Sequence, residues 1–357
     1  MIKFILGKLL YGFLVMIGVV CVVFLLFNIL PGDPARMMLG QRADISSVEA
    51  INRELGLDRP VSEQFALFLN DLSPISMHSK DASSPWGYDN NKYGSVVELV
   101  HLDYNTILIK WPYLKRSYQS NQRVSEILMD ALPGTAILAI VALTFAIIAG
   151  IFLGVIAALK KGTWIDYISM LTAVMGMAVP SFFAGIIIAW VFGFLLSDYT
   201  GLNMTGSLYS IDPFKGVILQ PANLILPAFT LGIRPLSVIV QLTRSSMLEV
   251  LSKDYIRTAR AKGLAKFKVV FKHSLKNSLN PVLTAVSGWF GSLLAGAVFI
   301  EYIFGWKGIG KITVDSLERY DFPVVMGAVL MVSVFFVIIN ILVDLLYGVL
   351  DPRVRIK

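Results

Sequence analysis

The chain has 357 residues, of which 56% are hydrophobic and only 15% are charged, with a formal net charge of +7. Soluble domains typically carry about 25% charged and about 45–50% apolar residues, so this composition favours a membrane protein. The single cysteine, Cys21, excludes a disulfide framework and a cysteine-based metal site. The three histidines are far apart in the sequence and lack the spacing of metal ligands.

Six apolar stretches could each cross a bilayer, which takes about 20 apolar residues in a helix. They are residues 9–30, 136–159, 167–196, 217–242, 282–303 and 324–350. The first could also be a cleaved signal peptide, but its apolar run is too long, and PGDPAR follows it in place of a small-residue cleavage site. The chain therefore divides into a first span (1–30), an intervening segment (31–130) and a core of five further spans (131–357).

The intervening segment has two parts. Residues 44–69 have the pattern of short amphipathic helices with a proline-containing turn. Residues 70–112 are rich in Ser, Asp, Asn, Pro and Tyr, which indicates an irregular or small β-containing insertion. Its runs SVVELV and NTILIKW favour strands.

Basic residues in the short loops predict the orientation, because they collect on the cytoplasmic side. The N-terminus carries Lys3 and Lys8, and the loop after the second span carries Lys160 and Lys161. The loop after the fourth span carries nine: Arg244, Lys253, Arg257, Arg260, Lys262, Lys266, Lys268, Lys272 and Lys276. The tail adds three more at 353, 355 and 357. All these basic residues lie on the cytoplasmic side of the membrane if both termini are cytoplasmic, and the segment 31–130 is then extracytoplasmic. The membrane orientation thus explains the positive charge, and nucleic-acid binding is not needed to explain it.

Several residues within the predicted spans are unusual for an apolar helix. Pro180 lies inside the third span and Arg234-Pro235 interrupts the fourth, and a proline inside a helix removes a hydrogen bond and kinks it. Arg234 would face a cavity or a partner, unless it lies near the interface, and Asp344 in the sixth span could cap or pair. Pro180, Arg234 and Asp344 are therefore candidates for the pathway or its gating, with ordinary packing as the alternative. Gly150 and Gly154 form a GxxxG pattern that allows close helix approach.

The run GWKGIGK at 305–311 almost matches a phosphate-binding loop, but Ile312 replaces the Ser or Thr that would hold magnesium. The motif also needs a strand before it, whereas this segment follows the fifth span. We interpret it as a glycine-rich turn back toward the membrane. No set of residues typical of hydrolases or metalloenzymes is present, so the sequence predicts neither an enzyme nor a metal site.

The basic segment 244–280 predicts a helix–turn–helix elbow. One apolar stripe comprises Leu248, Leu251, Tyr255 and Ala259, and a second comprises Phe267, Val270, Phe271, Leu275 and Leu279. Gly263 lies between them and can end one helix. Anionic lipid would explain the lysines, but it would not explain the small residues near the tip of the elbow, which are Thr258, Ala259, Ala261 and Gly263. A docking elbow explains both, because small side chains let the backbone enter a groove on a partner.

At DYIRTARAKGL (254–264) the sequence resembles the EAA-type loop of ABC importer permeases, in the dipeptide/oligopeptide/nickel subfamily, first (B-type) subunit. Similar agreement appears in FNILPGDPA, ELGLDRPVSEQF, EYIFGWKGIGK, DFPVVMGAVL and NILVDLLYGVLDPRVR. The resemblance covers nearly the whole chain apart from about 70–112. It implies a polytopic all-α membrane protein with six transmembrane helices in the type I importer architecture, with an extracytoplasmic insertion between the first two.

The resemblance further implies that the elbow is a coupling helix held in a groove of a partner ATPase. Its residues would be Asp254, Tyr255, Ile256, Arg257, Thr258, Ala259, Arg260, Ala261, Lys262, Gly263 and Leu264. The implied partners are a second homologous permease, two cytosolic ATP-binding subunits and an extracytoplasmic binding protein, all assembled at the bacterial cytoplasmic membrane. ATP and Mg would bind the partner subunits, so that this chain would hold no cofactor of its own.

Two departures leave the substrate open. Family members commonly carry Asp-Leu-Gly-x-Ser before the second span, where this chain has Tyr113-Leu114-Lys115-Arg116-Ser117, and the insertion at 70–112 precedes it. Di- or oligopeptides are the first expectation, with nickel chelates, glutathione or oligosaccharides as alternatives. An ion-driven secondary carrier would need a carboxylate in the membrane, which only Asp344 offers. A structural or signalling membrane protein fits the bent spans less well.

Overall fold

The computed structural model describes residues 2–29, 58–81 and 84–350, together with positions 48, 49, 52 and 56. Most of the amphipathic helices predicted before residue 58 and the basic tail at 353–357 lie outside the described residues. The chain divides into two compact units. Unit 1 comprises Met1–Phe13, Ala131–Ile312 and Val332–Lys357, and unit 2 comprises Leu14–Asp130 and Thr313–Met331. Four helices have residues in both units: α1 (Ile2–Ile29), α6 (Val124–Leu159), α15 (Ile309–Glu318) and α16 (Phe322–Leu350).

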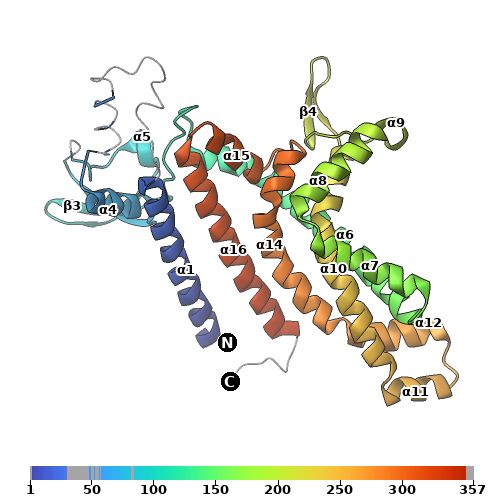
Figure 1. Cartoon of the computed structure of the whole chain (residues 1–357). Helices are drawn as coiled ribbons and strands as arrows, with labels where there is room; N and C mark the ends of the chain where they lie inside the picture. The colour runs from blue at the N-terminus through green and yellow to red at the C-terminus, as the bar shows by residue number, and fades with distance from the viewer. Residues whose placement is uncertain are drawn as a thin grey trace. The chain divides into compact units, whose positions relative to one another are not determined.

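The described chain is mostly helical, as the sequence predicts (Figure 1). Within it, α1, α6, α10 (Ala222–Leu251) and α16 are long and apolar enough to cross a membrane. Two further pairs of helical segments are bent at a short break, and the number of candidate spans rises to six if each pair forms one span. The first joins α7 (Trp164–Ala178) to α8 (Ser181–Trp190) and the π-helical turn η2 (Val191–Leu195), and the second lies within α14 (Asn280–Ile303). Up to six spans therefore occur in the predicted order.

Proline has different effects in two of these spans. Pro180 precedes α8 and follows extended Val179, and the chain bends by 110° between α7 and α8, so the predicted kink is confirmed. The predicted interruption at Arg234-Pro235 is wrong, because α10 continues through both Pro227 and Pro235. Membrane helices tolerate proline where neighbouring groups satisfy the freed backbone carbonyl.

The predicted start of the fourth span at residue 217 is also wrong. Residues 217–219 belong to a hairpin of β4 (Tyr209–Asp212) and β5 (Gly216–Leu219), and α10 begins at Ala222 after Pro221. The run Val217–Leu219 is apolar but β-branched in part, and hydropathy alone does not separate such a strand from a helix. The short helix α9 (Ser197–Thr200) precedes this hairpin.

The contact between α6 and α10 in unit 1 depends on glycine. A Cβ atom at Gly150 would lie 2.7 Å from Cγ2 of Ile239, and one at Gly154 would lie 2.6 Å from Cβ of Thr243. Both distances are far shorter than ordinary carbon contacts, so only glycine permits this approach. The close helix packing predicted from GxxxG is therefore confirmed.

Unit 2 contains a three-stranded antiparallel sheet in the order β1-β3-β2. The strands are β1 (Ile75–Ser79), β2 (Val97–His101) and β3 (Asn105–Ile109), so both predicted strand runs are confirmed. Helices α4 (Val61–Leu72) and α5 (Asn90–Tyr93) pack nearby around buried Asp71. Tyr93 donates a hydrogen bond of 2.7 Å to Asp71 Oδ1, and Lys92 Nζ lies 3.0 Å from the same oxygen. Lys110, which directly follows β3, donates to the Asp71 carbonyl oxygen at 2.6 Å, and burial lowers the pKa of its amine to about 8.

His78 makes the stability of this insertion depend on pH. Its ring is buried within hydrogen-bond distance of Ser76 Oγ (3.0 Å), and burial, followed by nearby Lys110, lowers its pKa. The unfolded chain therefore binds the proton more readily, so stability should fall as the pH drops below about 6.5. Hydrogen exchange of the β1 and β3 amides between pH 7 and 5 checks this. A His78→Gln variant should lose much of the dependence and an exposed His101→Gln variant should keep it; equal profiles would contradict the assignment.

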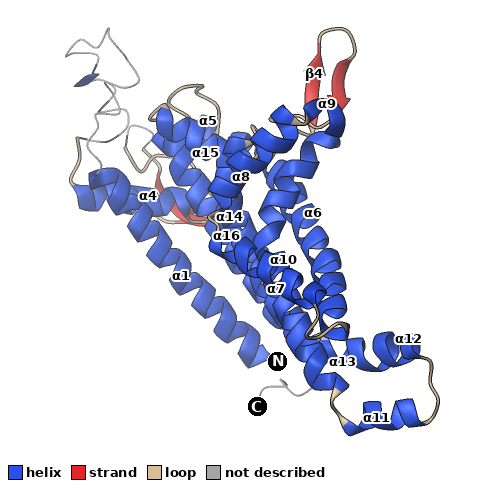
Figure 2. Ribbon diagram, turned by 45° about the vertical axis from the view of Figure 1, so that its right-hand side comes forward, coloured by secondary structure: helices blue, strands red, loops and turns tan. Residues whose placement is uncertain are grey.

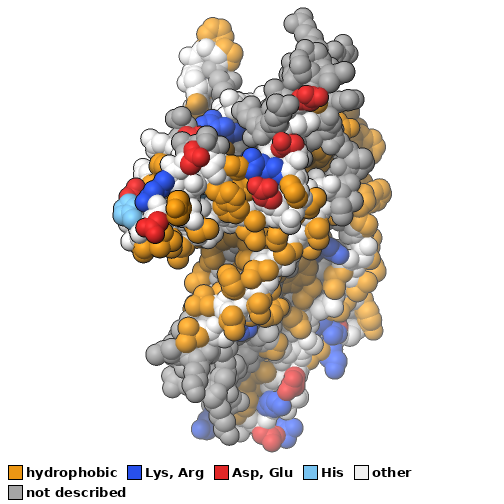
Figure 3. Space-filling view, turned by 90° about the vertical axis from the view of Figure 1, so that its left-hand side faces the viewer, with side chains coloured by type: hydrophobic (Ala, Val, Ile, Leu, Met, Phe, Trp, Pro, Cys, Tyr) orange, Lys and Arg blue, Asp and Glu red, His pale blue; other side chains and the backbone are white. Residues whose placement is uncertain are grey.

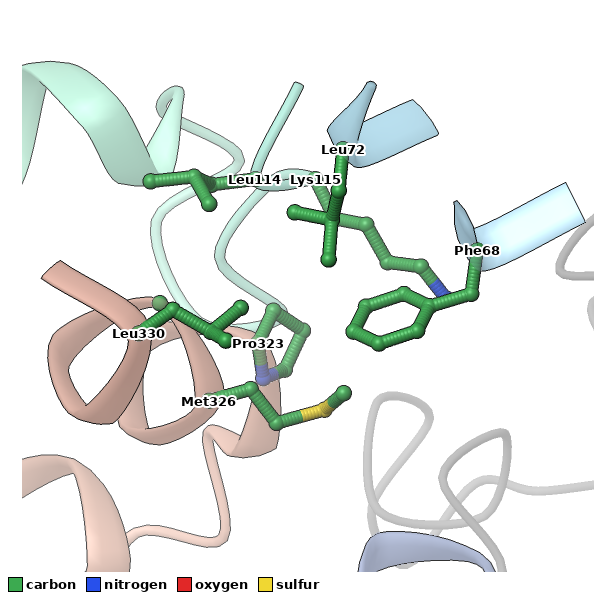
Figure 4. A pocket seen from close by; sticks show the side chains of 8 residues that line it. Phe68, Leu72, Leu114, Lys115, Pro323, Met326 and Leu330 are labelled. Carbon is green, nitrogen blue, oxygen red and sulfur yellow. The ribbon is translucent and has the colours of Figure 1, made fainter. Parts of the chain in front are cut away.

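A small apolar pocket in unit 2 contains the side chain of Lys115 (Figure 4). Phe68, Leu72, Leu114 and Met326 are among its lining residues, and Lys115 Nζ lies 6.0 Å from the centre of the Phe68 ring. Lys115 has a backbone φ of +67°, a conformation that glycine adopts without strain.

Candidate functional site

The predicted helix–turn–helix elbow is present between α10 and α14 (Figure 2). Its first arm is α11 (Asp254–Ala261), and its second consists of α12 (Lys266–Lys268), the π-helical η3 (Val269–Leu275) and α13 (Lys276–Ser278). One detail of the prediction is wrong, because Leu248 and Leu251 belong to α10 and not to the helix of Tyr255 and Ala259. The chain turns at 252–253, where Lys253 is extended and begins the new helix.

Gly263 terminates the first arm in a Schellman motif. Its φ is +76°, its N–H donates to the Arg260 carbonyl at 3.0 Å, and the N–H of Leu264 donates to the Ala259 carbonyl at 3.3 Å. These two bonds and a contact between Leu264 and the Ala259 cluster define this type of helix end. A side chain at residue 263 would be strained by the backbone angle alone, since nothing lies within 4 Å of its Cβ position.

The inner face of α11 packs against the second arm. Ile256 is fully buried and Ala259 nearly so, in a cluster with Val250 and Val269. This corrects one expectation: Ala259 is not part of a small-residue docking tip, because the period of the helix turns its methyl group toward the elbow's own core. A large residue at 259 would disrupt the elbow itself and would not specifically test docking.

The second arm joins the elbow to the spans. Val270 packs with Val155 of α6 and Met247 of α10, whereas its neighbour Val269 packs against α11. The side-chain amide of Asn277 also donates a 2.9 Å hydrogen bond to Tyr255 Oη. The two arms and the ends of α6 and α10 are therefore packed together through contiguous side chains.

The outer face of α11 is exposed, small and basic. Its exposed residues are Asp254, Tyr255, Arg257, Thr258, Arg260, Ala261, Lys262 and Gly263. Three of these, Thr258, Ala261 and Gly263, leave the backbone accessible, and Arg257, Arg260 and Lys262 surround them. The part of the chain that the structure describes offers no cluster of His, Cys, Asp or Glu suited to a metal. The geometry is suited to contact with another macromolecule.

The three pathway candidates lie in different environments and are not brought together. Pro180 sits at the sharp bend before α8. Arg234 is exposed on the surface of this chain, in the middle part of α10, and forms no ion pair with the described residues. Asp344 of α16 pairs with Lys8 of α1 at 2.6 Å, which is the pairing alternative left open by the sequence.

Sequence reasoning missed a buried ion pair between α7 and α10. Arg244 donates to both carboxylate oxygens of Asp166, at 2.5 and 2.7 Å, and Asp166 also accepts the N–H of Gly162. The sequence predicts Arg244 in the loop after the fourth span, but it lies inside α10. The two residues are 78 positions apart, and no local pattern links them.

Breaking this pair should destabilise the protein strongly. Asp166→Ala leaves the partly exposed Arg244 guanidinium without its partner, and the loss of such a hydrogen-bonding partner typically costs about 1–3 kcal/mol. Thermal unfolding of the purified protein in detergent measures the effect. The surface pair of Glu249 and Lys253 (3.0 Å) gives the control, and Glu249→Ala should change stability by no more than about 1 kcal/mol. Similar losses of stability in the two variants would show that the ion pair of Asp166 and Arg244 contributes no more than a surface ion pair.

A second missed feature is Glu301 of α14, whose side chain is fully buried. One oxygen accepts the N–H groups of Gly310 (2.7 Å) and Lys311 (3.2 Å) in the first turn of α15. Ile309 N–H donates to Thr135 Oγ1, and Trp306 Nε1 donates to the Gly134 carbonyl, both at 2.9 Å. These bonds hold residues 305–308 in a tight turn, with Gly305 at φ +63°, whereas residues 309–311 already belong to α15. The glycine-rich turn expected at 305–311 is therefore confirmed for its first part only.

Packed, bent spans with an exposed basic elbow define a multi-span membrane component built to engage a partner. The sequence matches the family described as "Binding-protein-dependent transport system inner membrane component" over residues 150–356. Residues 1–108 match the N-terminal domain of the same class of membrane component. The chain belongs to this family, and it is a non-catalytic, multi-pass inner-membrane permease subunit of an ABC importer of the dipeptide and glutathione group. This membership decides against the ion-driven carrier.

Curated relatives match over their full length. A dipeptide transport system permease protein of Alkalihalophilus pseudofirmus is 34% identical, covering 99% of this chain and 100% of the relative. One of Escherichia coli K12 is 35% identical over the whole of both chains. A glutathione transport system permease protein of Salmonella choleraesuis is 33% identical, again over both full lengths. Among solved structures, an inward-facing methionine ABC transporter is similar with a TM-score of 0.49 and 17% identity, covering 63% of this chain and 96% of that one.

Proposed function

We propose that this chain carries di- or oligopeptides across the cytoplasmic membrane, as one of two homologous permeases, driven by two cytosolic ATP-binding subunits and supplied by an extracytoplasmic binding protein. The exposed elbow packed onto α6 and α10 supports this proposal most directly. ATP and Mg would act on the partner subunits, where closure would push α11 and shift the spans. Glutathione is the second candidate substrate, since relatives named for both substrates match the whole chain at similar identity.

In the proposed orientation the elbow and both termini lie in the cytoplasm. Within unit 1, the start of α1, the end of α16 and α11 lie at the same end of the helices (Figure 1). The basic residues of these segments would then all be cytoplasmic, as the loop charges require. The segment 31–130 would be extracytoplasmic, where a binding protein would dock.

Two experiments, copurification of the partners and a transport assay, test this proposal. The tagged chain is extracted gently from its own membranes, and its partners are identified by mass spectrometry. We expect a second permease with one or two ATP-binding subunits. In reconstituted vesicles a dipeptide should then compete with a labelled tripeptide for ATP-dependent uptake. A homo-oligomer without ATPases would refute the assembly, and competition by glutathione alone would move the substrate to the second candidate.

Within this function, Arg234 is suited to bind the carboxylate of the substrate. It lies about 18 Å along α10 from Ala222, in the middle part of a helix about 45 Å long, and it is exposed from this chain. A charge at that depth is stable only in a polar cavity or beside a partner. Arg234→Gln should raise the KM for peptide uptake at least tenfold and Arg234→Lys should restore part of the affinity. An unchanged KM in both variants would remove Arg234 from the pathway.

A further inference from the structure

One face of the sheet in unit 2 is apolar and is left uncovered by the described residues. The strand register aligns Ile75, Ile109 and Val97 in one row, and Met77, Ile107 and Val100 in the next. The opposite face carries Ser76, His78 and Leu108, which are buried. In the apolar rows, Ile75, Met77, Val97, Val100 and Ile109 are between 42% and 62% exposed. A contiguous apolar surface of this kind normally has a partner.

A large aromatic residue extends this face. Trp111 continues the alternation of β3 on the side of Ile109, and its side chain is 85% exposed. Tryptophan and tyrosine concentrate where a membrane meets water, because each combines an apolar ring with a polar group.

The elements that support the sheet place it beside the end of a membrane span. Phe68 of α4 packs on Val20 and Phe24 of α1, with 5.6 Å between the centres of the Phe24 and Phe68 rings. Val20 lies about 12 Å along the helix from Asn28, where the apolar stretch of α1 ends. The contact between α4 and α1 therefore extends to a depth at which α1 is surrounded by the hydrocarbon of the bilayer.

A pair of hydrogen bonds fixes the sheet to that support. Asn70 of α4 donates to the Met77 carbonyl at 3.1 Å and accepts the Met77 N–H at 2.9 Å. The sheet is thus joined through α4 to the outer turns of α1. On this part of the molecule hydrophobic side chains gather below the charged ones (Figure 3).

We propose that the apolar face of the sheet rests on the phospholipid bilayer, in the leaflet where α1 ends. The surface is joined through α4 to a membrane span, its two rows contain no charged residue, and an interface-preferring tryptophan borders it. The charged residues Glu98 and His101 lie in register with Leu108 and Thr106, on the opposite face. This contact goes beyond the proposed transport function, and it orients the insertion by laying it flat on the membrane.

Fluorescent probes in the full chain test the contact. In a Cys21→Ala background, Val97→Cys and the adjacent Glu98→Cys carry an environment-sensitive fluorophore on opposite faces of one strand. A third variant, Trp111→Cys, provides a second probe at the border of the apolar face. The labelled chains are placed in lipid nanodiscs, alone and within the assembled importer. Doxyl-labelled phospholipid and aqueous iodide serve as the quenchers.

The probes at 97 and 111 should be quenched several-fold more strongly by doxyl lipid than the probe at 98, and iodide should show the reverse order. Iodide quenching of all three would place the face in water and overturn the proposal. Shielding of 97 and 111 from both quenchers in the assembled importer would indicate a protein partner, which also overturns it. The uptake assay is independent of these outcomes, so failure here leaves the proposed transport function intact.

Discussion

Gly263→Val should reduce peptide uptake by about tenfold or more while the protein still reaches the membrane. The residue has φ +76° and closes the Schellman motif that separates the two arms of the elbow. A β-branched residue in that conformation costs about 1–2 kcal/mol, and the chain can relieve the strain only by changing the end of α11. A loss of about 1.4 kcal/mol in docking equals a tenfold loss of affinity. Uptake and ATPase activity stimulated by the binding protein measure the effect.

Gly162→Val is the matched control for this substitution. Gly162 also has φ +76° and open space around its Cβ position, and it lies in the turn between α6 and α7. The two substitutions therefore introduce the same backbone strain at different sites. Uptake should remain near the wild-type rate in Gly162→Val. If both variants lose uptake equally, strain alone explains the loss and the coupling role of the elbow is unsupported.

The elbow was predictable because its signals are local. Gly263 marks a helix end, and the apolar positions on either side repeat at helical spacing, so the sequence predicted two arms and a turn. The role of Ala259 was not predictable, because its burial depends on contact with Val269 after the chain has reversed direction. A stripe identifies an apolar face but does not identify what covers it.

Long-range polar contacts were beyond sequence reasoning. Asp166 and Arg244 each resemble an ordinary charge near a span end, and only the packing of α7 on α10 brings them together. Hydropathy likewise could not separate the hairpin at 209–219 from the start of α10, since a short apolar strand and a helix turn have similar composition. The continuous course of α10 through Pro235 depends on neighbouring groups rather than on local propensity.

Gly310→Ala should strongly destabilise the junction of α14 and α15. A Cβ atom there would lie 2.4 Å from the Cα atom of Val298 and 2.9 Å from a carboxylate oxygen of Glu301. The first neighbour is backbone, so α15 has to move away, which lengthens the 2.7 Å hydrogen bond from Gly310 N–H to Glu301. Overpacking of this kind typically costs about 1–3 kcal/mol, and weakening a hydrogen bond to a buried carboxylate adds to it. Thermal unfolding in detergent should show a clear loss of stability.

Gly18→Ala serves as the control, because Gly18 lies inside α1 with nothing within 4 Å of its Cβ position. Alanine there should be neutral or stabilising by up to about 1 kcal/mol, since glycine is the weaker helix former. Glu301→Gln offers a second variant that adds no bulk but replaces one of the two acceptor oxygens of the carboxyl group with an NH2 donor. A stable Gly310→Ala protein together with a stable Glu301→Gln protein would show that the turn is not held by this carboxylate. Loss of stability in both would identify Glu301 as the residue that fixes where the fifth span ends.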